Sequence, residues 1–312
     1  MSYLPSRDLS NDAERMKLMR ILLLGGNGQL GSDFRRRAGG DDKAQLRVFT
    51  RDDLDLAALD RIAAKLADVD FDVLVNATGY HKTDEVESNA QLAATINAHA
   101  PLRLAEVCAS RRARLVDIST DYVFGGQAGR SPLIETDASA PLNVYGASKL
   151  MGEALTLSSG ADVLVARVSS LFGVAGASGK GGNFVETMLR LAKEKGALSV
   201  VDDQIMAPTA TQDAAEALWR LISTRAPAGL YHVAGTGAAS WFDFAREILA
   251  CAGLSHVPIT PVPTARMPTP ARRPPYSVLA NDKLTQTLGW TMPEWRDGLD
   301  RYLIAKGHKT TT

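Results

Sequence analysis

The chain is poor in cysteine and histidine, the side chains from which disulfide frameworks and zinc sites are built. Its 312 residues include two cysteines, Cys108 and Cys251, and neither belongs to a Cys-x-x-Cys pair. Buried free thiols in a reducing compartment are therefore expected in place of a disulfide framework. The five histidines are scattered, without His-x-x-x-His spacing or a Cys/His cluster. Neither a structural nor a catalytic metal is expected.

Charge imbalance and long apolar runs are missing as well. Lys and Arg total 35 and so do Asp and Glu, which argues against a nucleic acid or an anionic membrane as partner. No apolar run approaches the ~20 residues that a membrane span needs, and the polar start contains no signal peptide. We predict a cytoplasmic protein with a disordered leader over residues 1–16.

What is present is an ordinary globular composition, 45% hydrophobic and 22% charged, with alternating strand and helix patterns. Strands are predicted at 18–24, 46–50, 73–75, 115–118 and 163–168, and helices include 57–66, 89–111, 184–194 and 290–303. The alternation predicts an α/β fold with a doubly wound, Rossmann-type parallel sheet. We expect a dinucleotide-binding domain at 17–168 and a smaller α/β substrate domain at 169–312. Helix 212–223 and strand 229–234 are expected to pack back on the first domain.

A glycine-rich turn joins the first strand to its helix. Glycines 25, 28 and 31 give Gly-x-x-Gly-x-x-Gly. Such a turn needs free backbone angles, close approach of a pyrophosphate and tight packing of helix on strand. The helix N-terminus then offers N–H donors to phosphates. The motif predicts dinucleotide binding.

The end of the second strand bears on cofactor choice. It ends in Thr50-Arg51, where a cofactor with a free ribose 2′-hydroxyl usually meets a carboxylate. Arg51 can face a 2′-phosphate, so NADP(H) is preferred, and NAD(H) stays open because Asp52 and Asp53 follow. Asp55 is interpreted as an N-cap of the next helix.

A tyrosine and a lysine, Tyr145 and Lys149, lie four residues apart at the head of a predicted helix. At that spacing both side chains share one face. A free phenol has a pKa of about 10, which a neighbouring cation lowers. The pair therefore predicts a general acid, against the alternative of an ordinary surface helix with a half-buried tyrosine.

The glycine turn, Asn76-Ala77, Ser119-Thr120 and Tyr145-x-x-x-Lys149 resemble the extended short-chain dehydrogenase/reductase family in order and spacing, and six longer motifs narrow the resemblance. They are "GGNGQLG", "VNATGYHKTDEVES", "ISTDYVFGG", "VYGASKLMGE", "VDDQIMAPT" and "RPPYSVLANDKL". More narrowly, they are similar to its dTDP-4-dehydrorhamnose reductase subfamily, from Arg20 to Leu303. The resemblance implies NADPH-dependent reduction of the 4-keto group of a nucleotide-activated 6-deoxysugar, dTDP-4-dehydro-L-rhamnose first, to dTDP-L-rhamnose.

The same resemblance implies roles for individual residues. Tyr145 would donate a proton to the C4 oxygen, and Lys149 would lower the pKa of Tyr145 and bind the nicotinamide ribose. Thr120 would hold the carbonyl oxygen or the tyrosine hydroxyl, unless it is an ordinary strand residue. The cofactor contacts implied by the resemblance and the glycine motif are Gly25, Gly28, Gln29, Leu30, Gly31, Asn76, Ala77, Tyr80 and Asn97. Asn97 has the alternative of capping or packing its own helix.

For the substrate, the resemblance implies contacts from Asp121 and Tyr122, although Tyr122 can also be core. Ser170 stands where the subfamily has tryptophan, which leaves the identity of the sugar open. Asn183, after a glycine-rich loop containing Lys180, is a candidate for phosphate binding, with a solvated loop as the alternative. In the proline-rich stretch 258–275, Arg272 or Arg273 is expected to reach a diphosphate, with disorder as the alternative.

Rival functions follow from the same motifs. Within the class they are another nucleotide-sugar ketoreductase, or an epimerase or dehydratase that retains NAD. A non-catalytic relative resembling the regulatory β subunit of methionine adenosyltransferase is the rival of a different class. The sequence leaves a homodimer open and has no readable pattern for a Mg²⁺ at a dimer contact.

Overall fold

The first apolar run forms strand β1 (Met19–Leu24), which is buried on both faces. Ile21 and Leu23 point into one apolar cluster, and Leu22 and Leu24 into a second on the opposite side. This alternation is what a central strand of a sheet covered by helices on both faces requires. The computed structural model describes residues 18–127, 129–176 and 182–310. The predicted leader at 1–16 lies outside them.

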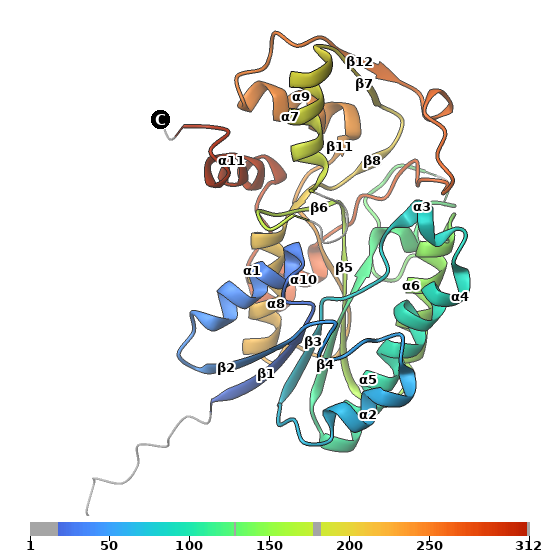
Figure 1. Ribbon diagram of the computed structural model, residues 1–312, viewed down its shortest axis with the longest axis vertical. Coiled ribbons are helices and arrows are strands. Elements are labelled where there is room, and N and C mark those ends of the chain that lie inside the picture. The colour runs from blue at the N-terminus through green and yellow to red at the C-terminus, as the bar shows by residue number, and fades with distance from the viewer. Residues whose placement is uncertain (1–17, 128, 177–181, 311–312) are drawn as a thin grey trace, which may run out of the picture.

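A parallel sheet of six strands is the centre of the fold (Figure 1). Its order is β10 (Gly229–Val233), β5 (Asp162–Val168), β4 (Arg114–Thr120), β3 (Val73–Asn76), β1 and β2 (Ala44–Phe49). Every neighbouring pair is parallel. The chain proceeds outward from β1 to β2 and then returns to β3 on the other side, so a switch point lies between β1 and β3. Ligands of open α/β sheets bind at such points.

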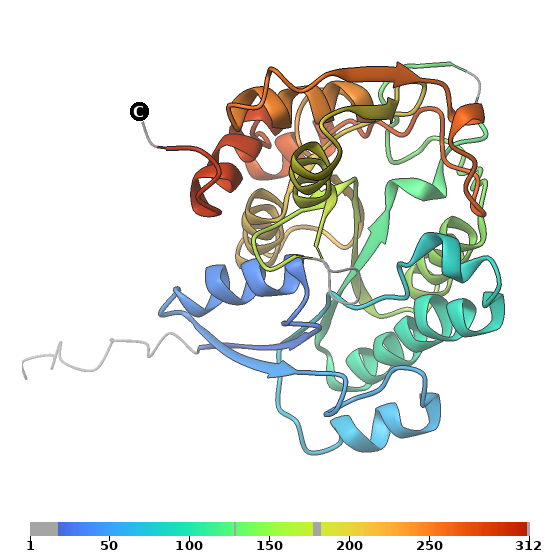
Figure 2. The same ribbon diagram turned by 45° about the horizontal axis from the view of Figure 1, so that its top comes forward.

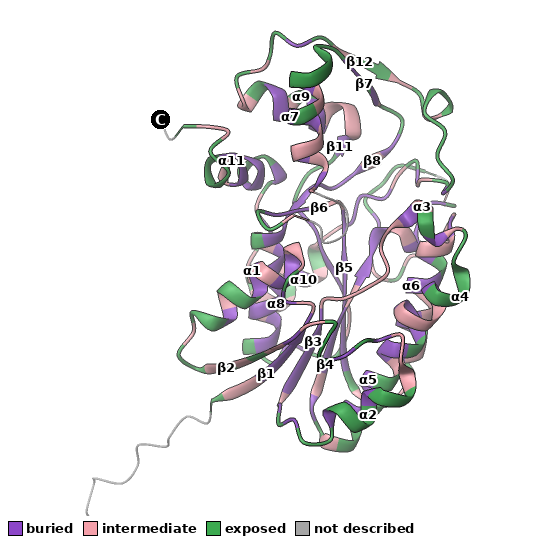
Figure 3. Cartoon of the chain, viewed as in Figure 1, coloured by how far each residue is buried: buried purple, intermediate pink, exposed green. Residues whose placement is uncertain are grey.

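Helices cover both faces of this sheet (Figure 1). One face carries α1 (Gln29–Gly39), α8 (Thr211–Ser223) and α10 (Asp282–Leu288). The other carries α2 (Leu59–Leu66), the short α3 (Thr83–Val86), α4 (Ala90–Ala94), α5 (Ala100–Arg111) and α6 (Val144–Leu157). Burial follows this arrangement, with the inner strands such as β3 buried, the edge strand β2 partly exposed and the outward helix faces exposed (Figure 3). The predicted doubly wound sheet is confirmed.

A smaller unit lies beyond the carboxyl end of the sheet. It contains α7 (Phe184–Lys195), α9 (Trp241–Cys251) and α11 (Trp295–Ala305), with the short strands β6 (Leu171–Phe172), β7 (Leu198–Val201), β8 (Ile205–Met206), β9 (Thr209–Ala210), β11 (Ala239–Ser240) and β12 (Ile259–Val262). Its core includes Phe172, Phe244, Trp295 and Tyr302 in edge and tilted ring contacts. From β12 the chain passes through a 3-10 turn, η3 (Thr264–Arg266), and descends toward α3 (Figure 2).

Three helix predictions need correction. The predicted helix 89–111 is interrupted by a π turn, η1 (Thr95–His99), in which Ala100 donates to the carbonyl of Thr95. Pro101 explains the interruption, because it has no N–H for the carbonyl four residues earlier. The predicted helix 57–66 begins at Leu59 and the predicted helix 290–303 at Trp295, since Pro293 disfavours helix before it. None of the described helices is long and apolar enough to span a membrane.

Candidate active site

The glycine turn after β1 is as tight as its sequence predicts. Gly25 has φ of +80°, a conformation that side chains disfavour. A Cβ on Gly31 would lie 2.1 Å from the carbonyl oxygen of Gly25, so helix α1 starts directly against the turn. A Cβ on Gly25 would lie 2.8 Å from the carbonyl oxygen of Ala77, just after β3. The turn is therefore wedged into the switch point between β1 and β3.

The start of α1 has what a pyrophosphate requires. Its first turn contains no acidic residue, and Gly28 at its N-cap provides no side-chain cap. Gln29 donates from Nε2 to the Leu171 carbonyl at 3.2 Å, while its buried Oε1 has no protein partner among the described residues. Leu30 lies in the apolar core, so only its backbone can face a ligand. Free N–H groups, close backbone approach and an unused buried acceptor all fit a bound dinucleotide.

At the end of β2 the structure adds a carboxylate close to the strand end. Asp53 folds back and accepts from the N–H and hydroxyl of Thr50 at 2.7 and 2.8 Å. The backbone bond from Thr50, followed by its hydroxyl bond, lowers the pKa of Asp53. The side chain of Arg51 is 79% exposed and only 3.4 Å from Asp55. We had expected Asp55 to cap α2, but it does not. Asp55 accepts from the Ala57 N–H in the preceding turn, and the N-cap of α2 is Ala58.

Three residues with predicted catalytic roles meet at the carboxyl end of the sheet. Thr120 is the last residue of β4, and Tyr145 and Lys149 lie on the first turns of α6. Asn143 caps α6 by accepting from the Gly146 N–H at 2.8 Å. The side chains of Thr120 and Tyr145 share a hydrogen bond. The arrangement holds the phenol of Tyr145 next to the carboxyl end of β4.

The environment of Tyr145 differs from the one that its spacing to Lys149 predicts. Burial raises the pKa of Tyr145, the Thr120 hydrogen bond opposes that rise, and the charges of Asp121 and Asp117 add to it. The expected lowering of its pKa by Lys149 is therefore wrong for this structure. The Lys149 ammonium lies 3.7 Å from Asp117 Oδ2, so its charge is offset by that carboxylate. The phenol is protonated at neutral pH, which is the form that can donate.

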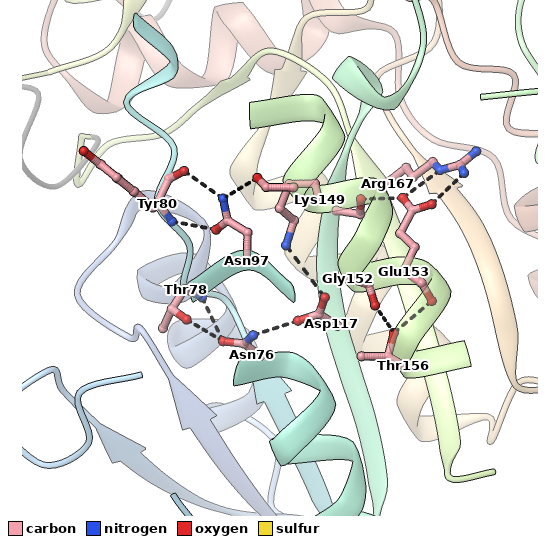
Figure 4. A network of polar contacts seen from close by, with 12 residues as sticks. Asn76, Thr78, Tyr80, Asn97, Asp117, Lys149, Gly152, Glu153, Thr156 and Arg167 are labelled. Atoms are coloured by element: carbon pink, nitrogen blue, oxygen red, sulfur yellow. Dashed lines mark hydrogen bonds and ion pairs between the residues drawn. The ribbon is translucent and has the colours of Figure 1, made fainter. Parts of the chain in front are cut away.

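A chain of buried polar side chains leads away from Lys149 (Figure 4). Asn76 donates to Asp117 Oδ1 at 2.7 Å, and the hydroxyl of Thr78 donates to Asn76 Oδ1 at 2.6 Å. Asn76 is thus occupied at both ends of its amide and holds the loop after β3. Sequence reasoning missed Asp117, although a carboxylate inside an apolar strand was the available sign.

Asn97 shapes the same loop from the other side (Figure 4). It accepts from the Tyr80 N–H at 2.8 Å and donates to the Tyr80 carbonyl and the Ser148 hydroxyl, each at 3.0 Å. It is fully buried, so the expected direct contact of its side chain with a cofactor is replaced by an indirect role. The hydroxyl of Tyr80 donates to Glu85 at 2.7 Å. Of the other predicted cofactor contacts, Ala77 and the backbone of Tyr80 lie on this loop, at the switch point.

The carboxylate of Asp121 is buried among hydroxyl groups of the protein. It is 2% exposed and accepts from the hydroxyls of Ser277 at 2.6 Å, Ser169 at 3.0 Å and Thr120 at 3.2 Å. Burial raises its pKa to about 6, against the hydrogen bonds, which lower it. We had expected this carboxylate to contact the sugar. Instead, its hydrogen bonds join the ends of β4 and β5 to the C-terminal segment. Tyr122, partly exposed, lies edge-on to Tyr145 with ring centroids 5.9 Å apart.

Asn183 and Ser170 are the predicted substrate contacts that follow β5. Asn183 is buried as the N-cap of α7, and its Nδ2 donates to the Gly173 carbonyl and the Tyr302 hydroxyl, so the phosphate role is contradicted. Lys180 lies outside the described residues. Ser170, between β5 and β6, has φ of +42°, a strained value for a non-glycine residue.

The proline-rich stretch is ordered, and its last residues lie against the start of α6 and Tyr122. Arg272 is exposed, and its carbonyl accepts from Asn143 at the start of α6. Arg273 was the alternative to Arg272, and it pairs with Asp84 at 2.8 Å and lies 6.0 Å over the Tyr122 ring. Its guanidinium is thus engaged by the protein, while that of Arg272 faces solvent.

One further pair was not foreseen. Glu153, on the same face of α6 as Lys149, accepts from Arg167 at 2.9 and 2.7 Å and from the hydroxyl of Ser119 (Figure 4). Both charged side chains are 4% exposed. Their bonds fix α6 against β4 and β5, next to Thr120.

A doubly wound parallel sheet with a glycine turn at its switch point defines a Rossmann-type, dinucleotide-binding class of protein. Within that class, the family model described as the RmlD substrate binding domain matches residues 19–307, and the chain belongs to this family.

Proteins similar to this chain match it over most of its length. A dTDP-4-dehydrorhamnose reductase of Burkholderia thailandensis is 38% identical over 293 residues, which cover 89% of this chain and 96% of that protein. The crystal structure of a dTDP-4-dehydrorhamnose reductase from Clostridium acetobutylicum superposes with a TM-score of 0.87 at 35% identity, covering 93% of this chain and all (100%) of that one. A Bacillus anthracis dTDP-4-dehydrorhamnose reductase solved in complex with NADP gives a TM-score of 0.85 at 34% identity, covering 92% and 99%.

Proposed function

We propose that the protein reduces the 4-keto group of dTDP-4-dehydro-L-rhamnose to give dTDP-L-rhamnose, with NADPH as reductant. The observation that carries this is the grouping of Thr120, Tyr145 and Lys149 at the carboxyl end of the parallel sheet, the same end at which the glycine turn follows β1. Relatives at 36–38% identity named for this reduction support the substrate.

Each residue has a distinct part. A dinucleotide whose pyrophosphate is held at the glycine turn would supply the hydride for C4 from its reduced nicotinamide. Tyr145 donates its proton to the C4 oxygen as negative charge develops there, and the raised pKa keeps that proton in place until then. Thr120 holds the tyrosine hydroxyl. Lys149 would place a positive charge one helical turn away from Tyr145 and would bind the nicotinamide ribose. Such proton transfer contributes about 10²–10⁴-fold to the rate.

NADP(H) is the preferred cofactor in this proposal. The exposed Arg51 is loosely paired and can turn to a 2′-phosphate, and a similar enzyme binds NADP. Asp53 at the end of β2 works against a 2′-phosphate, so NAD(H) remains the second cofactor. The ratio of kcat/KM for NADPH to that for NADH measures the preference.

The nucleotide sugar is proposed to lie between the two halves of the chain. Tyr122 offers an aromatic face next to Tyr145, Ser170 lies between β5 and β6, and Arg272 is free to meet a diphosphate. In this division residues 17–168 bind the dinucleotide and 169–312 mainly the substrate. The homodimer and the cytoplasmic location remain predictions, and light scattering on the purified protein tests the first.

The deciding experiment is NADPH consumption with dTDP-, UDP- and GDP-linked 4-keto-6-deoxy sugars. We expect oxidation in proportion to product, fastest with the dTDP-4-dehydrorhamnose substrate. Protein that purifies with bound NAD and returns the hydride would instead be an epimerase or dehydratase. No turnover on any sugar, together with co-purification of a second protein, would indicate a non-catalytic binding role.

A further inference from the structure

Lys149 and Asp117 form an ion pair inside the protein. The ammonium is 3.7 Å from Asp117 Oδ2, and the two side chains are 4% and 1% exposed. An ammonium removed from water loses its proton readily unless an anion stands beside it. The charge of Lys149 therefore depends on the groups around it.

Those groups can be named element by element. α6 itself presents Tyr145 and Glu153, β4 presents Asp117, and the turn after β4 presents Asp121 and Tyr122. Glu153 is committed to Arg167 through a bidentate contact, and Asp121 is 2% exposed among three hydroxyls. Among the described residues, the ion pair recorded for Lys149 is the one with Asp117.

Asp117 is itself held from the opposite side. Asn76 donates to its Oδ1 at 2.7 Å, and Thr78 fixes the Asn76 amide in turn (Figure 4). Residue 77, between these two, lies against Gly25 of the glycine turn. The carboxylate thus links the turn at the switch point to the lysine on α6.

We propose that Asp117 is a positioning residue for the reduction. Oriented by Asn76, it holds the Lys149 ammonium in place one helical turn from Tyr145. This role rests on the proposed function, because it acts through Lys149 and touches neither the sugar nor the tyrosine hydroxyl.

The first test is the Asp117→Asn variant, which keeps the size of the side chain and its acceptor for Asn76. We expect kcat/KM to fall about tenfold at neutral pH and the alkaline limb of its pH profile to move about one pH unit or more lower, because the buried ammonium then lacks its anion. In the Lys149→Arg background the movement of the limb should vanish, since arginine stays charged. An unchanged alkaline limb in the Asp117→Asn variant overturns the proposal.

The matched control is Asp213→Asn. Asp213 lies on α8, on the other face of the sheet, and also pairs with a basic residue, Arg301. Its pH profile should match the wild type. If Asp117→Asn does not fold, the smaller Asp117→Ser, which can still accept from Asn76, replaces it with the same expectation.

A stability cycle tests the pairing without turnover. Asp117→Asn should lower Tm in the wild type and leave it unchanged or raise it in the Lys149→Met background, where no buried ammonium is stranded. Equal losses in both backgrounds contradict the pairing. If the wild-type protein consumes no NADPH with any sugar, the proposed function fails, while this cycle still decides whether Asp117 supports the charge of Lys149.

Discussion

Helices α6 and α8 lie on opposite faces of the same sheet and bury very different side chains. The buried residues of α8 are Thr211, Ala214, Ala215, Ala217, Leu218, Trp219, Leu221 and Ile222, nearly all apolar. Those of α6 are Gly146, Ser148, Lys149, Gly152, Glu153 and Thr156, all polar or glycine. One helix is held by apolar volume and the other by directional bonds.

The difference accounts for where the reactive groups are. Apolar packing tolerates small shifts, whereas buried polar groups must meet specific partners or be left unsatisfied at a cost. On α6 these partners include Ser119 and Arg167 for Glu153, Asn97 for Ser148 and Asp117 for Lys149. The polar face therefore fixes the orientation of α6, and with it that of Tyr145, at the carboxyl end of the sheet.

The largest effect is expected from Tyr145→Phe on α6. Removal of the hydroxyl removes the proton donor, so kcat should fall about 10²–10⁴-fold, while NADPH affinity stays nearly unchanged. Steady-state kinetics and titration of NADPH fluorescence measure the two. Leu218→Ala on α8 is the comparison, and its kcat should be near that of the wild type. Near-normal turnover by the Phe variant would refute the assigned role.

The next effect is on stability. Glu153→Gln leaves the Arg167 guanidinium buried without its anion, which should cost about 3–5 kcal/mol of unfolding free energy. Arg167 is 3% exposed, so water cannot replace the carboxylate. Leu218→Ala should cost about 2–5 kcal/mol through the cavity it leaves. Urea unfolding measures both.

The two losses differ in how they can be repaired. Adding Arg167→Met to Glu153→Gln should restore much of the stability, because no charge is then stranded. If the double variant were no more stable than Glu153→Gln alone, the contrast between the two helices would not hold.

The sequence predicted the sheet and most of its helices because their apolar patterns are local. Motif spacing also predicted the glycine turn and the pairing of Tyr145 with Lys149, and the family resemblance added Thr120 to that pair. The π turn at Thr95–His99 and the start of α11 at Trp295 were missed, since each depends on how a proline redirects neighbouring backbone.

What the sequence could not predict is the direction in which polar side chains point. Asn97 and Asp121 were expected to face ligands. Both side chains instead form hydrogen bonds with residues distant in the chain, such as Tyr80 and Ser277. Asn183 caps its own helix. Asp117 was overlooked because its partners Asn76 and Lys149 lie 41 and 32 residues away in the sequence and meet only across the folded sheet.

A smaller effect, confined to a pH window, is expected at Asp121 beneath the site. Its pKa is raised from 3.8 to about 6, so the folded protein resists ionisation and stability on this account falls as pH rises from about 4 to about 6. The gap corresponds to about 3 kcal/mol. Asp121→Asn removes the ionisable carboxyl and with it this loss. The stability of the variant relative to the wild type should therefore increase between pH 4.5 and pH 7.5. Denaturant unfolding at the two pH values checks this, and a difference independent of pH would contradict it.

The smallest effect compares two ion pairs, one near each helix. Asp84 pairs with Arg273 over the start of α6 and is 43% exposed, so Asp84→Asn should change stability by only about 1 kcal/mol or less. It also releases Ala271, whose N–H donates to Asp84, and so loosens the segment that lies against Tyr122. We expect KM for the nucleotide sugar to rise a few-fold with kcat retained. Asp213→Asn, which breaks the pair with Arg301 at α8, should leave KM unchanged. Equal KM changes in both variants would mean that the segment over α6 has no special part in holding the sugar, because loss of any ion pair would then have the same consequence.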